Sequence, residues 1–377
     1  MPQLPASGAK LNEISQEILR GPTLCSLRLY SFRCFKNASF DFVPGLNLIY
    51  GPNATGKTSI LEAIHFLCIG KSFLSGSDRQ VVLHHAPSMR LQGFFQPQAE
   101  VGLTWSSDEG KRIYVNGVLQ PRLTDHVGRF TVVVASPSDH LLVDESGHDR
   151  RRFMDLTLAQ TSPGYLEALL QYNRLLQQRN ALLRQLEPTK PDLLLLQTVD
   201  EQLNQPAHVL WEHRSRLAEK LAEGVIEFFH ELSGGKELVT VQYQTCAAKQ
   251  PLSQVLAGRR HYDLQLKHTT AGMHRDDLQF LLNGQPIRHY GSQGQKKSFT
   301  LALRLAQHAF LTQNNRQAPL LLVDDYADRL DSSRRHAFLR LLKQGNFPQV
   351  LLTHTDPHDC IVAETIDNLI ELPSPSG

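Results

Sequence analysis

Residues 51 to 58 read Gly51-Pro52-Asn53-Ala54-Thr55-Gly56-Lys57-Thr58 and match the phosphate-binding loop G-x-x-x-x-G-K-S/T at every fixed position. The glycines let successive backbone N–H groups curl around phosphates, Lys57 reaches the outer phosphates, and Thr58 offers its hydroxyl to Mg²⁺. Residues 46–50 predict a buried strand before the loop, and apolar residues over 60–67 lie at helical spacing after it. An ordinary glycine-rich turn is the alternative, but this context favours a nucleotide site over residues 51–59, with Ser59 as the last contact.

The composition is that of a globular protein without covalent or metal cross-links. The 377 residues suffice for one large or two modest domains, and five cysteines without a C-x-x-C pair indicate a reducing compartment and no structural zinc. A formal net charge of +2 gives no overall basic field, although a local basic face remains possible. No apolar run approaches the roughly 20 residues that span a bilayer, and residues 1–22 lack a signal-peptide core. We expect a cytoplasmic protein without a membrane partner.

The pattern divides the chain into four parts. Residues 1–22 predict a loosely held N-terminal extension. Residues 23–152 predict an ATPase lobe with short strands before the loop and an antiparallel layer over 91–135, where Asn116-Gly117 marks a hairpin turn. Residues 153–265 predict a mainly helical insertion, because leucines recur at helical spacing over 165–186, 193–203 and 209–232. Residues 266–377 predict a second ATPase lobe.

A second group of polar residues follows two apolar runs in the last part of the chain. Residues 320–323 predict a buried strand that ends in Asp324 and Asp325, the form of a Walker B element. Asp324 is predicted to hold Mg²⁺ and Asp325 to act as the general base that polarises the attacking water. Two solvated aspartates at a strand end are the alternative. Asp331 lies where a D-loop aspartate is expected, and His354 ends another apolar strand, placed to sense the terminal phosphate.

Two stretches compete for the signature element, which reaches across a dimer to the partner's nucleotide. Residues 232–236 look like a transporter signature, but they lie 92 residues before Asp324 and lead into a strand-like run. Ser292-Gln293-Gly294-Gln295 lies 32 residues before Asp324 and opens an apolar-periodic helix, with Ser292 as a suitable cap. Anion binding needs a helix N-terminus, where free N–H groups face the phosphate. We therefore predict that Ser292, Gln293, Gly294 and Gln295 contact the nucleotide.

Together these elements predict an α/β fold of the ATP-binding cassette (ABC) type. It is a P-loop ATPase head with a mixed central sheet, an antiparallel β layer and an inserted α-helical subdomain. ATP and Mg²⁺ are the expected ligands, and Lys57, Asp325 and His354 the expected catalytic residues. Since the signature acts in trans, ATP is expected to join two subunits in a two-fold dimer that hydrolysis releases.

With these motifs in place, the chain resembles the RecF family of bacterial recombination and gap-repair ATPases, which are related to SMC heads. The resemblance covers Leu24 to about Asp356. It is carried by residues 29–33 (LYSFR), 51–64, 136–139 (SPSD), 151–155 (RRFMD), 178–183 (QRNALL), 272–278 (GMHRDDL), 290–295 (YGSQGQ) and 324–325. The chain departs from the family at Arg329, commonly acidic in relatives, at His354, where many carry threonine, and in the extension 1–22.

The resemblance implies a slow, DNA-stimulated ATPase that dimerises with ATP and binds gapped DNA or junctions between single-stranded and duplex DNA. It also implies that the protein acts together with RecR and RecO to load RecA. A transporter subunit fits less well, since Asp325 stands where it would carry glutamate. An SMC-like DNA-tethering head is the alternative function, but only 234 residues separate Thr58 from Ser292, too few for long heptad arms. A structural protein would need neither Lys57 nor the two aspartates.

The candidate DNA contacts are arginines of the predicted insertion and its border. Solvated helical faces or internal ion pairs explain each of them equally well. The candidates are Arg150, Arg151, Arg152, Arg174, Arg179, Arg184, Arg214 and Arg216. Residues 274–277 (HRDD) are likewise open to two interpretations, a coupling element near the signature or a buried polar network.

Overall fold

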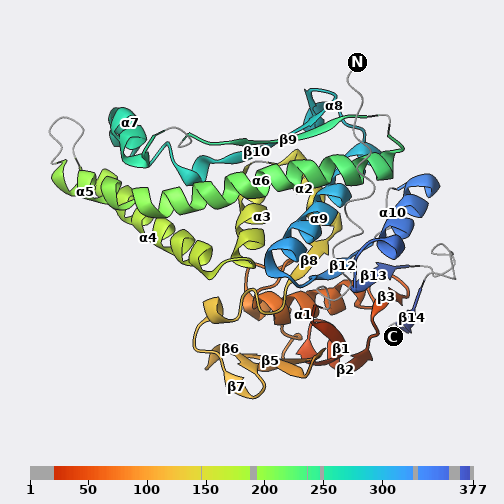
Figure 1. Cartoon of the computed structure of the whole chain (residues 1–377). Helices are drawn as coiled ribbons and strands as arrows, with labels where there is room; N and C mark the ends of the chain where they lie inside the picture. The colour runs from red at the N-terminus through yellow and green to blue at the C-terminus, as the bar shows by residue number, and fades with distance from the viewer. Residues whose placement is uncertain are drawn as a thin grey trace.

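The computed structural model of the chain describes residues 21–145, 147–186, 193–235, 237–246, 250–325, 330–355 and 366–373. These residues form three β-sheets with helices between and outside them (Figure 1). Residues 1–20 of the predicted extension lie outside this description, and so does Arg329.

A five-stranded sheet forms the centre of the molecule. Its order is β14-β3-β13-β12-β8, and every neighbouring pair is parallel. The strands are β3 (Gly45–Tyr50), β8 (Val132–Ala135), β12 (Leu320–Val323), β13 (Gln349–His354) and β14 (Asn368–Glu371). The carboxyl ends of parallel strands meet at one edge, where open α/β sheets bind their ligands. This edge gathers the phosphate loop after β3, Asp324 after β12 and His354 at the end of β13.

Both faces of this parallel sheet are buried. On β12, Leu320 and Leu322 enter one hydrophobic core, and Leu321 and Val323 enter the other. Parallel strands covered on both faces read as continuous apolar runs. The same reason corrects one prediction: the run 131–135 is not part of the antiparallel layer, because β8 pairs in parallel with β12. A strand buried on both faces has no alternation that would reveal its sheet.

An antiparallel sheet of six strands covers one face of the centre. Its order is β2-β1-β4-β5-β6-β7, and its strands are β1 (Thr23–Phe32), β2 (Phe35–Asp41), β4 (Ser88–Gln96), β5 (Ala99–Ser106), β6 (Gly110–Val115) and β7 (Val118–Leu119). The predicted hairpin turn is confirmed, since Asn116 and Gly117 have φ of 50° and 77°, the positive values of a type I′ turn. Helix α1 (Lys57–Ile69) is buried between this sheet and the parallel sheet (Figure 1).

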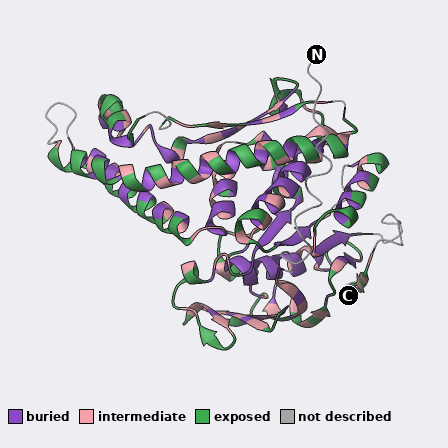
Figure 2. Cartoon of the chain, viewed as in Figure 1, coloured by how far each residue is buried: buried purple, intermediate pink, exposed green. Residues whose placement is uncertain are grey.

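The other face of the centre carries the remaining helices. They are α2 (His140–Asp144), α3 (Gly147–Ala159), α4 (Pro163–Gln185), α5 (Leu194–Gln202), α6 (Asn204–Ser233), α7 (Leu252–Leu266), α8 (Ile287–Tyr290), α9 (Gln293–Asn315) and α10 (Ser332–Gln344). The three predicted helical runs are confirmed as α4, α5 and α6. Helices α4, α5 and α7 project beyond the sheets with exposed outer faces (Figures 1 and 2). The predicted insertion border at residue 152 lies inside α3.

A third, small sheet packs against α6. It has the antiparallel order β11-β10-β9, with β9 (Val239–Gln244), β10 (Asp277–Leu282) and β11 (Gln285–Pro286). Its register sets Val239 opposite Leu282, so residues of the predicted insertion and of the predicted second lobe share one sheet. Among the helices of the described residues, none combines the length and the apolar character that crossing a membrane requires.

Candidate nucleotide-binding site

The phosphate loop has a backbone that only glycine accommodates at two positions. Gly56 caps α1 with φ of 99°, and a Cβ there would lie 2.6 Å from the Phe35 ring. Gly51 has φ of 150°, and a Cβ there would lie 2.5 Å from the Leu372 carbonyl oxygen. The loop therefore reaches α1 in a tight left-handed turn that brings backbone N–H groups to the helix N-terminus, where phosphates bind.

Lys57 lies inside this loop. Its Nζ donates hydrogen bonds of 2.7 Å to the Gly51 carbonyl and 2.8 Å to the Pro52 carbonyl. Burial lowers the pKa of Lys57, whereas the charges of Asp325 and Asp324 oppose that shift. The ammonium group is thus held where the phosphates of a nucleotide would need a counter-charge.

Thr58 and Asp324 meet across 266 residues of sequence. The Thr58 hydroxyl lies 3.0 Å from both carboxylate oxygens of Asp324, and Asp324 is 4% exposed. Burial and the neighbouring charge of Asp325 raise the pKa of Asp324, whereas hydrogen bonds from Thr353 and Thr58 oppose the rise. A hydroxyl and a carboxylate at this spacing form the oxygen donor set that Mg²⁺ prefers.

Thr353 connects the two aspartates and was missed by the sequence analysis. Its hydroxyl donates 2.7 Å to Oδ1 of Asp324 and accepts 2.8 Å from the backbone N–H of Asp325. Asp325 adopts φ of 45°, an uncommon value for a non-glycine residue that this hydrogen bond helps to hold. A signal existed, because Thr353 is a polar residue next to the predicted switch position at the end of an apolar strand.

His354 ends β13 beside the loop. It is buried and pairs in register with Tyr50, the residue before Gly51. The structure therefore brings the predicted switch residue next to the start of the phosphate loop. Cys34, in the turn after β1, and Phe35, the first residue of β2, are further neighbours that the sequence analysis did not identify, since both would meet a Cβ at Gly56.

The predicted signature opens a helix. Ser292 is the N-cap of α9, and it forms a reciprocal capping box with Gln295, which confirms the predicted cap. Gln295 also bonds Glu237, and Lys296 forms an ion pair of 2.7 Å with Asp144 of α2. Gly234, by contrast, is the C-cap of α6 with φ of 74°, so the competing stretch ends a helix and presents no N-terminus.

The signature turn lies next to the predicted D-loop aspartate of the same chain. A Cβ at Gly294 would lie 2.4 Å from Nη1 of Arg334, and Arg334 lies 3.6 Å from the Asp331 carboxylate. Asp331 is the N-cap of α10. The structure therefore groups the candidate nucleotide contacts into two sets. One set lies at the sheet edge and consists of residues 51–59, 324, 325 and 354. The other set consists of residues 292–295 and Asp331. Among the described residues, the polar contacts found for Ser292 and Gln295 do not reach the first set.

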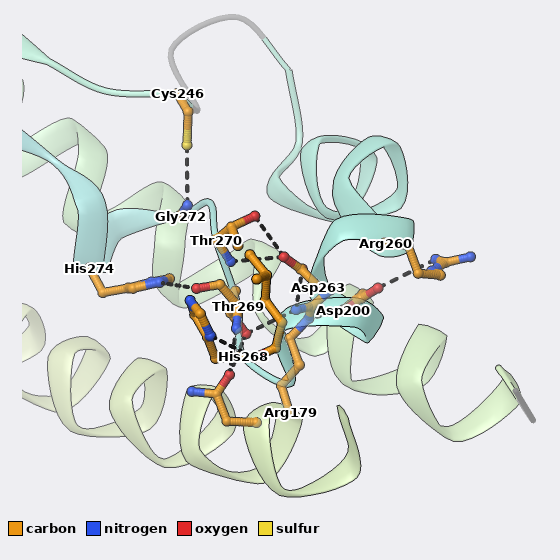
Figure 3. Close-up of polar contacts among 12 residues, drawn as sticks. Arg179, Asp200, Cys246, Arg260, Asp263, His268, Thr269, Thr270, Gly272 and His274 are labelled. Carbon is orange, nitrogen blue, oxygen red and sulfur yellow. Dashed lines mark hydrogen bonds and ion pairs between the residues drawn. The ribbon is translucent and has the colours of Figure 1, made fainter. Parts of the chain in front are cut away.

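Two of the candidate DNA contacts are buried. Arg179 is 0% exposed and forms ion pairs of 2.6 Å with Asp200 and with Asp263, as well as a hydrogen bond to Thr269 (Figure 3). Arg214 is 2% exposed. These two arginines cannot reach DNA, and the interpretation as internal ion pairs is confirmed for them.

His274, Asp276 and Asp277 belong to a polar network around the buried Asp276, whereas Arg275 is exposed. Asp276 accepts hydrogen bonds from Arg214 and Tyr243, and Asp277 accepts a bidentate pair from Arg150. His274 lies between Tyr172 and the Thr269 carbonyl, and burial lowers its pKa to about 4. The network ties α3, α4, α6 and the third sheet together, so these side chains hold the helical part in place.

Comparison with known proteins identifies relatives over most of the chain. A family model described as "AAA domain" matches residues 26–221. Proteins named DNA replication and repair protein RecF from Cytophaga hutchinsonii and Porphyromonas gingivalis are 34% and 36% identical over 334 and 335 residues. Each match covers 88% of this chain, together with 89% and 91% of the relative.

Solved structures show the same relationship. The recombination mediator protein RecF-ATPrS in the RecFOR pathway matches with a TM-score of 0.84 and 28% identity, over 94% of this chain and 97% of the other. The corresponding RecF-ATP structure matches with a TM-score of 0.82 and 29% identity, over 91% and 94%. The Smc head domain from Pyrococcus furiosus has a TM-score of 0.57 at 17% identity, over 93% of each chain, which shows the shared fold alone.

Proposed function

The chain belongs to the RecF family of DNA replication and repair proteins, and we propose that it is an ATP-dependent DNA-binding ATPase of recombinational gap repair. In this proposal ATP joins two heads on gapped DNA or on a junction between single-stranded and duplex DNA. The dimer helps RecO and RecR load RecA in the cytoplasm, and hydrolysis, slow and stimulated by DNA, releases the complex. Residues 23–152 and 266–377 form the two ATPase lobes around the helical insertion 153–265.

One observation carries the assignment of the nucleotide site. Thr58 and Asp324, far apart in sequence, lie within hydrogen-bond distance beside Lys57. A metal bound there would be held by these two side chains and would offset the charge of the outer phosphates. The donor set fits Mg²⁺, since both ligands are hard oxygens.

The remaining residues of the sheet edge suit hydrolysis. Lys57 would bind the outer phosphates, and Asp325 would accept the proton of the attacking water. Thr353 would hold the Asp325 backbone in position, and His354 would respond to the terminal phosphate from the end of β13.

The second set of candidates supports a site completed by a partner copy. Ser292 to Gln295 and Asp331 share a surface through Arg334, whereas their own phosphate loop lies elsewhere. In a two-fold dimer, the exposed N-terminus of α9 would face the partner's nucleotide and favour its negative charge.

Sedimentation with and without ATP, Mg²⁺ and gapped DNA tests this proposal. The wild-type chain is expected to dimerise only with ATP and to sediment with gapped DNA. Lys57→Ala is expected to remain monomeric, since the outer phosphates lose their cation, whereas the exposed Lys36→Ala is expected to behave as wild type. If Lys57→Ala dimerises normally with ATP, the assignment of the site is wrong.

A further inference from the structure

A cavity lies at the opposite end of α1 from the phosphate loop. Its volume is about 380 Å³, it is open to solvent on one side, and it is lined by the end of α1, residues 71–73, α3 and α4, together with Arg214 of α6 and His274. His65 and Ile69 line it from α1, so it begins roughly 12 Å along the helix axis from Lys57. Helix α1 therefore connects the two sites.

Positive charge dominates the polar lining of this cavity. Lys71, Arg151 and Arg152 contribute to it, whereas the lining Arg214 is already paired with Asp155 and Asp276. Asp155 is the one carboxylate that lines the cavity among the described residues. Asp155 already accepts a hydrogen bond of 2.5 Å from Tyr165 and one of 2.8 Å from Arg214. Lys71 and Arg152 are exposed at its rim, and neither forms an ion pair within the described part of the chain. The cavity therefore has uncompensated cations at its mouth.

Two histidines in the cavity wall have lowered pKa values, and nearby arginines are among the causes. Burial, together with the charges of Arg304 and Arg152, lowers the pKa of His65 to about 4, against an opposing hydrogen bond to the Lys71 carbonyl. Burial also lowers the pKa of His274 to about 4, with Arg275 and Arg151 among the added causes. Arginines therefore lie close enough to both rings to oppose a further positive charge there, in addition to the larger effect of burial.

The rest of the lining is apolar and includes an aromatic ring. Ile69, Leu156, Leu166 and Leu169 form a wall, and Phe73 stands at the side. The Phe73 ring is partly exposed and contacts His65 edge to face, with ring centroids 5.4 Å apart. Cations beside an exposed aromatic ring are the combination with which proteins hold single-stranded nucleic acid.

We propose that this cavity binds one unpaired nucleotide of a DNA strand. Lys71, Arg151 and Arg152 hold its phosphate, and the base packs against Phe73 and the apolar wall. The inference rests on the proposed function, which supplies DNA as the partner. A concave site of this size admits a single nucleotide and excludes a base pair. Contact with an unpaired base would thus give the protein its preference for gaps.

The cavity also points toward the ATPase site. A neighbouring cavity of about 320 Å³ adjoins it, and the two share the lining residues His65, Ile69, Phe73, Arg152 and Leu156. This neighbouring cavity reaches Ser136, which directly follows β8, and Asp139, four residues after the end of β8. The β8 residue Ala135 accepts a hydrogen bond of 2.8 Å from the N–H of Asp324. A nucleotide in the cavity would therefore lie on a packed path to the Walker B strand.

The double variant Lys71→Ala/Arg152→Ala tests the proposal in the full chain with ATP present. Both side chains are exposed, so the fold is expected to persist, and ATP should still raise the melting temperature. We expect affinity for a gapped duplex to fall about 10-fold and affinity for a blunt duplex to change less than about two-fold. The slope of log affinity against log salt on gapped DNA should decrease by about 0.7, the release expected for one single-strand phosphate contact.

The control variant Lys36→Ala/Arg90→Ala removes the same charge from exposed positions of the antiparallel sheet. It is expected to bind both DNAs as wild type does. Phe73→Leu keeps an apolar side chain but removes the ring, and it provides a readout that charge does not affect. A 2-aminopurine at the first unpaired position should be quenched by wild type and by the control, and regain most of its fluorescence with Phe73→Leu.

Three results would overturn the inference. Unchanged affinity of Lys71→Ala/Arg152→Ala for gapped DNA would remove the cavity from the DNA path. An equal loss on gapped and blunt DNA would assign these cations to duplex phosphates. Full displacement of the probe strand by free deoxynucleoside monophosphate would assign the cavity to a free nucleotide. If the wild-type chain binds neither DNA, the proposed function fails and the inference falls with it.

Discussion

The hydroxyl of Thr353, the second-last residue of β13, donates a 2.7 Å hydrogen bond to Oδ1 of Asp324, which directly follows the neighbouring parallel strand β12. The Thr353 hydroxyl oxygen also accepts a 2.8 Å hydrogen bond from the backbone N–H of Asp325. Thr353 therefore orients both aspartates of the Walker B element, although it belongs neither to that element nor to the phosphate loop.

Replacing Thr353 with valine should separate binding from turnover. Valine keeps the shape but removes both hydrogen bonds, and bonds to a charged group are worth about 1.5–3 kcal/mol. We expect kcat to fall about 10- to 100-fold, with ATP affinity nearly unchanged. Thr353→Ser, which retains the hydroxyl, should keep most of the activity. Equal turnover of the valine and wild-type proteins in a steady-state ATPase assay would show that this oxygen has no role.

Asp324→Asn should stabilise the ligand-free protein and abolish its response to Mg²⁺-ATP. The folded-state pKa of Asp324 is raised, mainly by burial, so its ionisation costs stability as pH rises through the acid range. A neutral amide avoids that cost, accepting from Thr353 and donating to Thr58. Thermal unfolding at pH 7 should show an unchanged or higher melting temperature without ligand and no further rise with Mg²⁺-ATP. A normal rise with Mg²⁺-ATP would contradict the metal role.

Asp325→Asn should bind ATP but hydrolyse it slowly. An amide cannot accept the proton of the attacking water, and loss of a general base costs about 10²- to 10⁴-fold in rate. The ATP-bound dimer should then persist, as seen by sedimentation over time after excess ATP is removed. Normal hydrolysis by this variant would assign the base to another group.

Mixing two inactive variants should restore activity if the signature acts in trans. Ser292→Arg places a cation and a long side chain at the N-terminus of α9, and Lys57→Ala disables the loop of the other copy. A mixed dimer contains one intact site, so the mixture should reach up to about a quarter of wild-type turnover. The proposal requires this recovery. Mixed dimers that form but stay inactive would mean that each chain uses its own signature.

His308→Gln should flatten the acid dependence of stability. His308 is buried beside Phe347, lies 3.0 Å from the Pro319 carbonyl, and has a pKa lowered to about 4 by burial. Because the unfolded chain binds this proton near pH 6.5, stability is lost as pH falls from about 6.5 toward 4, by about 2 kcal/mol between pH 7 and 5. Urea unfolding should show that much less loss in the variant.

The exposed His289 provides the matched control for this measurement. His289→Gln should lose stability with falling pH as wild type does. An equal dependence of stability on pH in His308→Gln and His289→Gln would show that protonation of His308 does not contribute to acid unfolding. Other buried groups would then cause the loss of stability.

Much of the fold follows from local patterns. The phosphate loop was predicted because its backbone needs glycine at residues 51 and 56, and a requirement of that kind is visible in the sequence. The helices α4, α5, α6 and α9 were predicted because each buries one face, so apolar residues recur with helical period. The cap at Ser292 was predicted for a similarly local reason, since its partner Gln295 lies three residues away.

What the sequence did not reveal depends on distant neighbours. The run over β8 was assigned to the wrong sheet, because four buried residues in succession do not identify the strand that pairs with them. Thr353 was overlooked because its value comes from Asp324, 29 residues away in sequence.

The arginines separate what the sequence determines from what only the tertiary structure decides. By itself the sequence determined the motifs of an ATPase head, because phosphate loops, caps and amphipathic faces are set by residues close along the chain. Tertiary structure alone decided that Arg179 is buried between two aspartates, while Arg152 at a cavity has no ion-pair partner among the residues that the structure describes. The energy of a charged side chain depends on its solvent and its counter-ions, and only the packed chain supplies both.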